Sequence, residues 1–334
     1  MKVGIVGLPN VGKSSIFNLL TQAHAQVAKF PFTTIDRNVG VVSIPDERLV
    51  QIVRMTHSPK VKFASVEVVD IAGLIKGASR GEGLGNKFLS HIRDVDLILH
   101  LLRCFTDPDI AHIDSKIEPK KDYEIVRAEL FLSDLAIVER RFEKIKKKAE
   151  FKAEIDRLHK IKASLEKGEV PSETILGLPL LSTKREIIIL NVDEDGNFTC
   201  DFRGFKISVK LEEDIQGFTE KEKEELRKEA GLDPGGLSNL LRLCLEKLSI
   251  ILFYTIKGEE SRAWPIRKGT KIIDAAGLIH TDIKNGFIKA EVLTYEDFIK
   301  TGGFSEAQQA GLTKIEGKEY IVNDGDIILV KFRG

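Results

Sequence analysis

Gly7-Leu-Pro-Asn-Val-Gly-Lys-Ser14 is the stretch that decides the fold of this chain. It follows a short apolar run of β-forming residues, Met1-Lys-Val-Gly-Ile-Val6, and precedes Ser15-Ile-Phe-Asn-Leu-Leu20, whose apolar residues have helical spacing. The pattern G-x-x-x-x-G-K-[ST] between a strand and a helix is typical of a loop that binds nucleotide phosphates. The alternative is a glycine-rich turn that precedes a lysine by chance, which the preceding strand disfavours.

The residue types of this loop each have a chemical reason. Glycine at positions 7 and 12 lets the backbone turn sharply and approach a phosphate without a Cβ in the way. Backbone N–H groups of the loop and of the following helix would then face the anion. The lysine can reach the β- and γ-phosphates, and the serine hydroxyl can bind Mg²⁺. The expected phosphate-binding residues are Gly7, Asn10, Val11, Gly12, Lys13, Ser14 and Ser15.

Length and composition limit the possible classes of protein. A chain of 334 residues is expected to form two or three domains. The 51 basic and 51 acidic residues cancel, so a surface for nucleic acid would have to be local. Cys104, Cys200 and Cys244 lie far apart, which argues against a disulfide framework or a zinc site and favours a cytoplasmic location. The sequence has no run of about 18 apolar residues, so no membrane contact is expected.

After the phosphate loop, predicted strands and helices alternate. Residues 39–44, 63–69, 97–102, 187–190 and 205–209 have strand patterns, and residues 46–55 and 86–94 have helical ones. Such alternation predicts an α/β fold with a parallel, doubly wound sheet and right-handed crossovers.

Two further regions differ in character. Residues 123–167 have apolar positions at helical spacing and are rich in lysine, which predicts two antiparallel helices that turn near residues 147–152. This arm is either a solvated charged face or a contact to ribosomal RNA or an acidic protein. Helices are predicted at 213–230 and 237–248. From residue 251 onward, short strands at 251–256, 262–266, 290–293 and 327–332 and a helix at 272–276 predict a small α+β unit.

Two segments after the phosphate loop indicate a GTPase-like switch. Thr33 and Thr34 follow the first helix, where a threonine would complete the Mg²⁺ shell and sense the γ-phosphate. Asp70 ends a strand and Gly73 follows three residues later; this D-x-x-G pattern holds the metal through water and places an N–H at the γ-phosphate. The expected metal site is therefore Ser14, Thr34 and Asp70, the last through water.

The segment that would read the base departs from the guanine pattern. Guanine recognition uses Asn-Lys-x-Asp, but the string here is Asn191-Val-Asp-Glu194, without the lysine and with a longer acid. A hydrogen-bond mismatch of this kind can reverse a preference, so adenine is favoured, although a variant that still binds GTP stays open. Backbone carbonyls near Val192 or Ser208-Val-Lys210 could accept from the adenine amine, with Val192 and Leu211 over the ring. The expected base-binding residues are Asn191, Val192, Glu194, Ser208, Val209 and Lys210.

Together these stretches resemble the YchF family, also known as the Obg-like ATPases, within the Obg-related P-loop GTPases. The matching stretches of the first part are Gly7 to Ser15, Phe30-Pro-Phe-Thr-Thr-Ile35, Asp70-Ile-Ala-Gly-Leu-Ile-Lys-Gly-Ala-Ser79, Arg103-Cys-Phe105 and Asn191-x-x-Glu194. Near the C-terminus, Arg262-Ala-Trp264, Ala275-Ala-Gly-Leu-Ile-His-Thr-Asp282, Gly286-Phe-Ile288 and Tyr320-Ile-Val-Asn-Asp-Gly-Asp326 resemble the TGS domain of that family.

The resemblance implies a three-part architecture: a Ras-like P-loop domain (1–118 and 183–250), an inserted helical, coiled-coil arm (119–182) and a β-grasp TGS domain (251–334). It also implies a monomer that hydrolyses ATP with Mg²⁺ in preference to GTP and acts in translation or stress regulation. The implied partner is the ribosome, as 50S subunit or 70S particle, contacted through rRNA and ribosomal protein. The arm is short for the family, which leaves contacts through it open.

The residue after D-x-x-G raises the question of what positions the attacking water. Ras-type enzymes have a glutamine there, whereas Leu74 has no hydrogen-bonding group. His112, in the polar loop after Leu102-Arg-Cys-Phe105, is the candidate catalytic residue, and the alternative is an ordinary surface histidine. Two other functions remain open: a conventional GTP-specific enzyme, and a binding module with negligible turnover.

Overall fold

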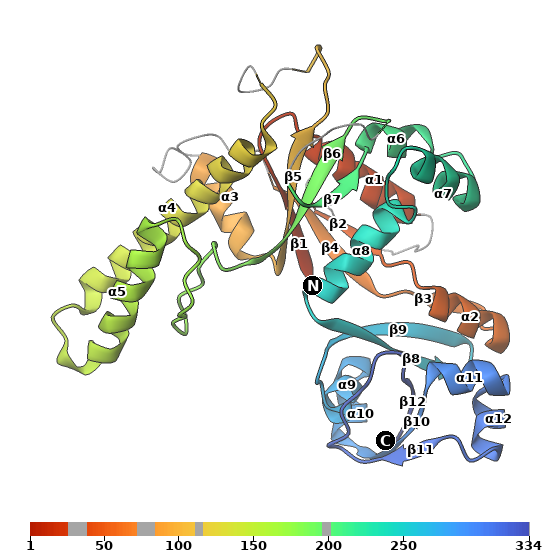
Figure 1. Ribbon diagram of the computed structural model, residues 1–334. Coiled ribbons are helices and arrows are strands. Elements are labelled where there is room, and N and C mark those ends of the chain that lie inside the picture. The colour runs from red at the N-terminus through yellow and green to blue at the C-terminus, as the bar shows by residue number, and fades with distance from the viewer. Residues whose placement is uncertain (26–38, 72–83, 111–115, 196–201, 334) are drawn as a thin grey trace. The chain divides into compact units, whose positions relative to one another are not determined.

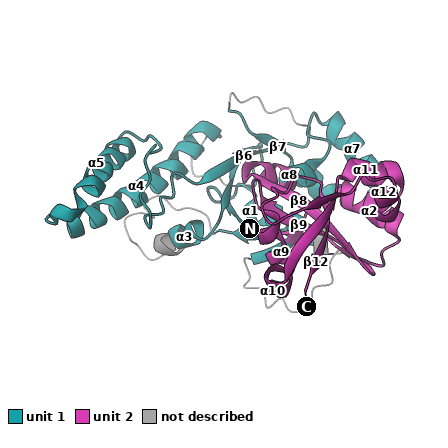
Figure 2. Cartoon of the chain, turned by 90° about the horizontal axis from the view of Figure 1, so that it is seen from below, with its two compact units in different colours: residues 1–23, 31–41, 67–240 teal, residues 24–30, 42–66, 241–334 magenta. Residues whose placement is uncertain are grey.

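The computed structural model describes residues 1–25, 39–71, 84–110, 116–195 and 202–333. By its contacts the chain divides into two compact units, which Figure 2 colours separately. The first unit contains residues 1–23, 31–41 and 67–240, and the second contains residues 24–30, 42–66 and 241–334.

The first unit is built on a six-stranded sheet with the order β2-β4-β1-β5-β6-β7 (Figure 1). Its strands are β1 (Lys2–Val6), β2 (Val39–Ser43), β4 (Ser65–Asp70), β5 (Leu97–Cys104), β6 (Arg185–Val192) and β7 (Phe205–Ile207). β1 pairs in parallel with β4 and β5, and β6 with β5 and β7. Every residue of β5 is buried, as is typical of a parallel sheet covered on both faces. The predicted parallel α/β sheet is confirmed.

The helices of this sheet differ in part from the prediction. They are α1 (Lys13–Ala25), α3 (Leu84–Arg93), α6 (Val209–Asp214) and α7 (Glu220–Glu229), while α8 (Gly236–Lys247) begins in this unit and ends in the second. Residues 208 and 209 are not part of a strand, because the Ser208 side chain accepts from Leu211 N and starts α6. The single helix predicted at 213–230 is also wrong. Thr219 and Glu222 form a capping box, which satisfies two N–H groups and starts α7 only there.

The predicted pair of antiparallel helices is confirmed. α4 (Pro119–Ile145) and α5 (Lys152–Glu166), joined through the short 3-10 helix η2 (Ala149–Phe151), lie side by side in Figure 1. Arg141 and Glu154 join the two helices through hydrogen bonds of 2.7 and 3.1 Å. An apolar seam holds them together, formed by Val138, Ile145, Leu158, Ile161, Leu165 and Leu180. No helix among the described residues is long and apolar enough to span a membrane.

The second unit has its own six-stranded sheet, with the order β11-β10-β12-β8-β9-β3. Its strands are β3 (Lys60–Lys62), β8 (Ile250–Lys257), β9 (Glu260–Arg267), β10 (Phe287–Leu293), β11 (Lys314–Glu316) and β12 (Ile327–Phe332). Its helices are α2 (Glu47–Thr56), α9 (Ile272–Ile279), α10 (Thr281–Asn285), α11 (Tyr295–Thr301) and α12 (Phe304–Gln309). The core between the sheet and α9 contains Phe253, Trp264, Ile272, Ala276 and Phe287.

α2 and β3 belong to this second unit although they come early in the chain. β3 pairs in parallel with β9, with Lys60 opposite Glu260 and Lys62 opposite Arg262. Ser58, in the turn before β3, is buried and lies 2.8 Å from the Ser261 hydroxyl of β9. The sequence predicted the helix at 46–55 but not its partners, which lie about two hundred residues further along the chain.

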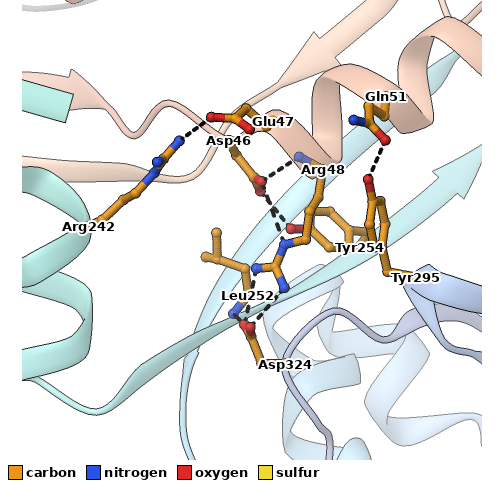
Figure 3. A network of polar contacts seen from close by, with 9 residues as sticks. All are labelled: Asp46, Glu47, Arg48, Gln51, Arg242, Leu252, Tyr254, Tyr295 and Asp324. Atoms are coloured by element: carbon orange, nitrogen blue, oxygen red, sulfur yellow. Dashed lines mark hydrogen bonds and ion pairs between the residues drawn. The ribbon is translucent and has the colours of Figure 1, made fainter. Parts of the chain in front are cut away.

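A polar network fixes the start of α2 to β8 and to the turn before β12 (Figure 3). The Asp46 carboxylate caps the helix by accepting from Arg48 N at 3.0 Å, and it also accepts from the Tyr254 hydroxyl at 2.7 Å. The Arg48 guanidinium donates to both carboxylate oxygens of Asp324, at 2.8 and 3.3 Å. Asp324 accepts in addition from Leu252 N, at 2.9 Å. Because these groups satisfy one another, residues 46–48 are an integral part of the C-terminal unit.

Candidate functional site

The sheet order places the quoted motifs at one edge of the first unit. β1, β5 and β6 are neighbours and run in parallel, so their carboxyl ends lie together. The phosphate loop follows β1, residues 105–110 follow β5, and the Asn-x-x-Glu string begins within β6. Ligands of open α/β sheets bind at this edge, outside the carboxyl ends of the strands.

The two glycines of the phosphate loop stand where a side chain does not fit. A Cβ at Gly7 would lie 2.4 Å from the Leu101 carbonyl oxygen, and Gly12 has φ +98°. A Cβ at Gly12 would lie 2.8 Å from the Asn191 side-chain amide nitrogen. Both glycines therefore allow close approach between the loop and the neighbouring strands, whereas the sequence had predicted a close approach to a phosphate.

Lys13 begins α1 and is 8% exposed. Its Nζ donates to the Leu8 carbonyl oxygen within the loop, at 2.6 Å. Burial lowers the pKa of Lys13 from its ordinary value to about 8, while the nearby Asp70 carboxylate opposes this shift. A desolvated ammonium at the loop would interact strongly with phosphate oxygens.

Triphosphate binding at about pH 9 is therefore expected to take up about one proton at Lys13, and binding at about pH 7 almost none. With a pKa near 8 the free amine is mostly neutral at the higher pH, and phosphate oxygens raise its pKa by favouring the ammonium. Calorimetry in two buffers with different ionisation enthalpies measures this uptake. Equal proton uptake at the two pH values would contradict the assignment to Lys13.

The expected Mg²⁺ ligands of α1 and β4 lie next to each other. The Ser14 hydroxyl donates to Asp70 Oδ2 at 2.8 Å. Asp70 Oδ1 is buried and has no hydrogen-bond partner among the described residues. A hydroxyl and a carboxylate with a free oxygen are hard ligands that suit Mg²⁺. Three predicted site residues, Thr34, Gly73 and His112, and also Leu74, lie outside the described residues.

Asn191 joins the phosphate loop to the start of α6. It is buried, donates from Nδ2 to the Val11 carbonyl at 3.0 Å, and accepts at Oδ1 from Val209 N at 3.0 Å. The same amide is the group that a Cβ at Gly12 would meet. The Asn-x-x-Glu string thus braces the phosphate loop through its first residue.

The Glu194 carboxylate forms an ion pair with Lys210 of α6. This contact raises the pKa of Lys210 above its ordinary value. The Val192 side chain is only 2% exposed and lies in an apolar cluster with Leu102 and Cys104. Little of its surface is left for a base, so a contact from Val192 would come from its backbone. Leu211 is half-buried against the same cluster.

Two side chains that the sequence left without a role also lie at this edge. Arg103 donates to backbone carbonyls of residues 105–110, and Asp193 accepts from a backbone N–H of the same residues. In the sequence, the signal that could point to such a role is an arginine placed directly after the apolar run 97–102, and the structure shows that its side chain is buried.

Comparison with known proteins agrees with this geometry. The family model "50S ribosome-binding GTPase" matches residues 2–133. A second model, named YchF-GTPase_C and described as a protein of unknown function, matches residues 250–333. The solved Schizosaccharomyces pombe YchF GTPase is 32% identical, with a TM-score of 0.84 over 99% of this chain and 97% of that one. A GTP binding protein from Pyrococcus horikoshii, 18% identical with a TM-score of 0.62, shares the fold.

Curated relatives extend the likeness to whole sequences. The "Ribosome-binding ATPase YchF" of Bacillus subtilis is 40% identical over 99% of both chains. The protein of that name from Escherichia coli O157:H7 is 39% identical over 98% of both. The predicted fold class, a P-loop α/β domain with a helical arm and a C-terminal TGS unit, is thereby confirmed. Because the identity runs through every part of the fold and not through the phosphate loop alone, this chain belongs to the YchF family.

Proposed function

We propose that this protein is a Mg²⁺-dependent nucleoside-triphosphatase that hydrolyses ATP in preference to GTP and acts as a ribosome-linked switch. The observation that carries this proposal is the 2.8 Å contact between Ser14 and Asp70. It joins the phosphate loop to the strand end from which the D-x-x-G segment starts, as a γ-phosphate-sensing switch requires. The names of the curated relatives, ribosome-binding ATPases, support the substrate and the partner.

The roles of the residues follow from their places. Lys13 would bind the β- and γ-phosphates, Ser14 and Asp70 would hold Mg²⁺ together with Thr34, and Asn191 would brace the loop. Mg²⁺ neutralises charge on the phosphates when it is bound. The three-part division of the chain at residues 118, 182 and 250, except that residues 42–66 pack in the C-terminal unit, and a monomeric, cytoplasmic state belong to the same proposal.

Phosphate release from ATP, with and without ribosomes, tests the hydrolytic function. The wild-type protein should release phosphate in Mg²⁺ and lose this activity in EDTA. The variant Ser14→Ala should weaken Mg²⁺-dependent binding and leave binding in EDTA almost unchanged, because it removes only a metal ligand. Tight binding without release under any condition would favour a nucleotide-dependent binding module, which Leu74 keeps open.

His112→Ala is expected to lower single-turnover hydrolysis by about 100-fold or more while leaving nucleotide affinity near wild type. The reason is that a histidine which positions water acts on the reaction step, and Leu74 cannot replace it. Leu74→Gln should not restore the rate. Single-turnover rates equal to wild type would show that His112 is an ordinary loop histidine.

Replacement of Lys146, Lys147 and Lys148 by alanine should weaken ribosome binding and flatten its salt dependence. These lysines are exposed at the turn of the arm, where contacts to rRNA phosphates would release counterions. Cosedimentation with ribosomes over a range of salt concentrations measures the effect, with Lys221, Lys223 and Lys228 of α7 replaced as the matched control. Unchanged binding at every salt concentration would mean that the arm is only a solvated helix pair.

A further inference from the structure

Arg103 closes the loop of residues 105–110 around its guanidinium group. The side chain is 2% exposed and comes from the carboxyl end of β5. Nε donates to the Phe105 carbonyl at 3.2 Å, Nη2 to the Asp107 carbonyl at 3.0 Å, and Nη1 to the Ile110 carbonyl at 2.9 Å. The guanidinium carbon also lies 4.5 Å from the centre of the Phe105 ring. One buried side chain thus fixes three peptide groups of a six-residue loop.

Asp193 holds the same loop from the neighbouring strand. Its carboxylate accepts from Thr106 N at 3.1 and 3.3 Å, and from the Thr106 hydroxyl at 3.2 Å. Asp193 is the third residue of the Asn-x-x-Glu string and stands beside Glu194. The string therefore has a contact to the loop after β5 in addition to its contact to the phosphate loop.

The two anchors start from one place in the sheet. β5 and β6 pair in parallel, with Arg103 opposite Asn191 and Cys104 opposite Val192. Asn191 holds the Val11 carbonyl of the phosphate loop. Consequently one strand pair fixes both the phosphate loop and residues 105–110, and it does so at the edge where nucleotides bind.

The chemistry of the anchor is specific to arginine. Its planar fork directs several N–H groups to fixed points, whereas a lysine ammonium has three donors on one atom and cannot reach three carbonyls spread along a loop. Buried carbonyls that lose their donors cost free energy or move to find water. Replacement of Arg103 should therefore release the loop.

We propose that Arg103 and Asp193 are positioning residues for nucleotide hydrolysis, which hold residues 105–110 in one conformation at the nucleotide edge. The proposal rests on the hydrolytic function proposed above. Affinity comes mainly from the phosphate loop, which follows a different strand, while the rate depends on groups held in place before reaction. A misplacement of about 1 Å can cost about 100-fold in rate. Loss of either anchor should therefore lower turnover and leave affinity almost unchanged.

Single-turnover hydrolysis of ATP and affinity for a non-hydrolysable ATP analogue test this in Asp193→Ala, Asp193→Asn and Arg103→Lys. Asp193→Ala and Arg103→Lys should lower the rate about 10- to 100-fold and change affinity less than about threefold. Asp193→Asn keeps an acceptor for Thr106 N and should retain most of the rate. The ratio of ATP to GTP affinity should not change, because Glu194 is untouched. Asp156→Ala and Arg157→Lys, both exposed on α5, are the matched controls.

Hydrogen exchange of the backbone amides of residues 106, 107, 109 and 110 shows independently whether the loop is released. The positioning role would be overturned if the amides exchange faster while the rate of ATP hydrolysis stays at the wild-type value. It would also be overturned if the rate of hydrolysis falls only in proportion to the affinity for the analogue. If Arg103→Lys does not fold, the variants of the half-buried Asp193 test the proposal without it. A wild-type protein that binds the analogue but releases no phosphate would overturn the proposed function itself, and the positioning role with it. If the wild-type protein hydrolyses ATP and the variants are equally active, only the positioning role would be overturned.

Discussion

Lys13→Ala is expected to lower the affinity for ATP by about 100-fold or more, the largest effect of any single substitution in this chain. The ammonium lies in the phosphate loop, where Lys13 is only 8% exposed, and its Nζ donates to the Leu8 carbonyl oxygen at 2.6 Å. No other lysine or arginine of the phosphate loop can replace its charge on the β- and γ-phosphates. Calorimetry with a non-hydrolysable analogue in Mg²⁺ measures the loss.

The structure also predicts that this loss is not caused by unfolding. Burial lowers the pKa of Lys13, so the charged amine destabilises the nucleotide-free fold, and its removal should leave the melting temperature unchanged or higher. Lys2→Ala is the matched control, since Lys2 begins β1 and is exposed in a surface ion pair with Glu67. Affinity equal to wild type in Lys13→Ala would remove the phosphate-loop assignment.

ATP is expected to bind more tightly than GTP by about five- to a hundredfold, corresponding to about 1–3 kcal/mol for unpaired polar groups of guanine. Guanine needs a carboxylate that accepts two N–H groups at a fixed distance. Here the acid is Glu194, which is one methylene longer than aspartate and is paired with Lys210. Calorimetric titration of wild type with the two non-hydrolysable analogues measures the ratio, and equal or tighter GTP binding would favour a conventional GTPase.

Glu194→Asp should move this preference toward GTP, because it shortens the acid and loosens its ion pair with Lys210. The guanine string also has a lysine at position 192, but Val192 is buried among Leu102, Cys104 and Leu190. A lysine there would bury an ammonium in an apolar cluster, so Val192→Lys is expected to destabilise the fold. Glu213→Asp, on the exposed part of α6, is the matched control. A ratio unmoved by Glu194→Asp would mean that Glu194 does not select the base.

The sequence alone determined the features that depend on neighbouring residues. The phosphate loop is one contiguous string between a strand and a helix, and its two glycines stand where a side chain would not fit. The alternating pattern predicted a parallel sheet, and the apolar spacing of residues 123–167 predicted the helix pair, because both patterns repeat within a single element. The predictions failed where a local cap intervened: Ser208 ends the strand predicted at 205–209 early, and Thr219 starts α7 within the single helix predicted at 213–230.

The tertiary structure alone decided how distant residues meet. Ser14 and Asp70 are 56 positions apart, Asn191 and Val11 are 180 apart, and Arg48 and Asp324 are 276 apart. The same applies to β3, three residues long, which pairs with β9 of the C-terminal sheet. Such contacts leave no periodic pattern in the chain, because each depends on strand order and on the satisfaction of individual polar groups. Sequence therefore determined the kind of site, whereas the fold determined which side chains brace it.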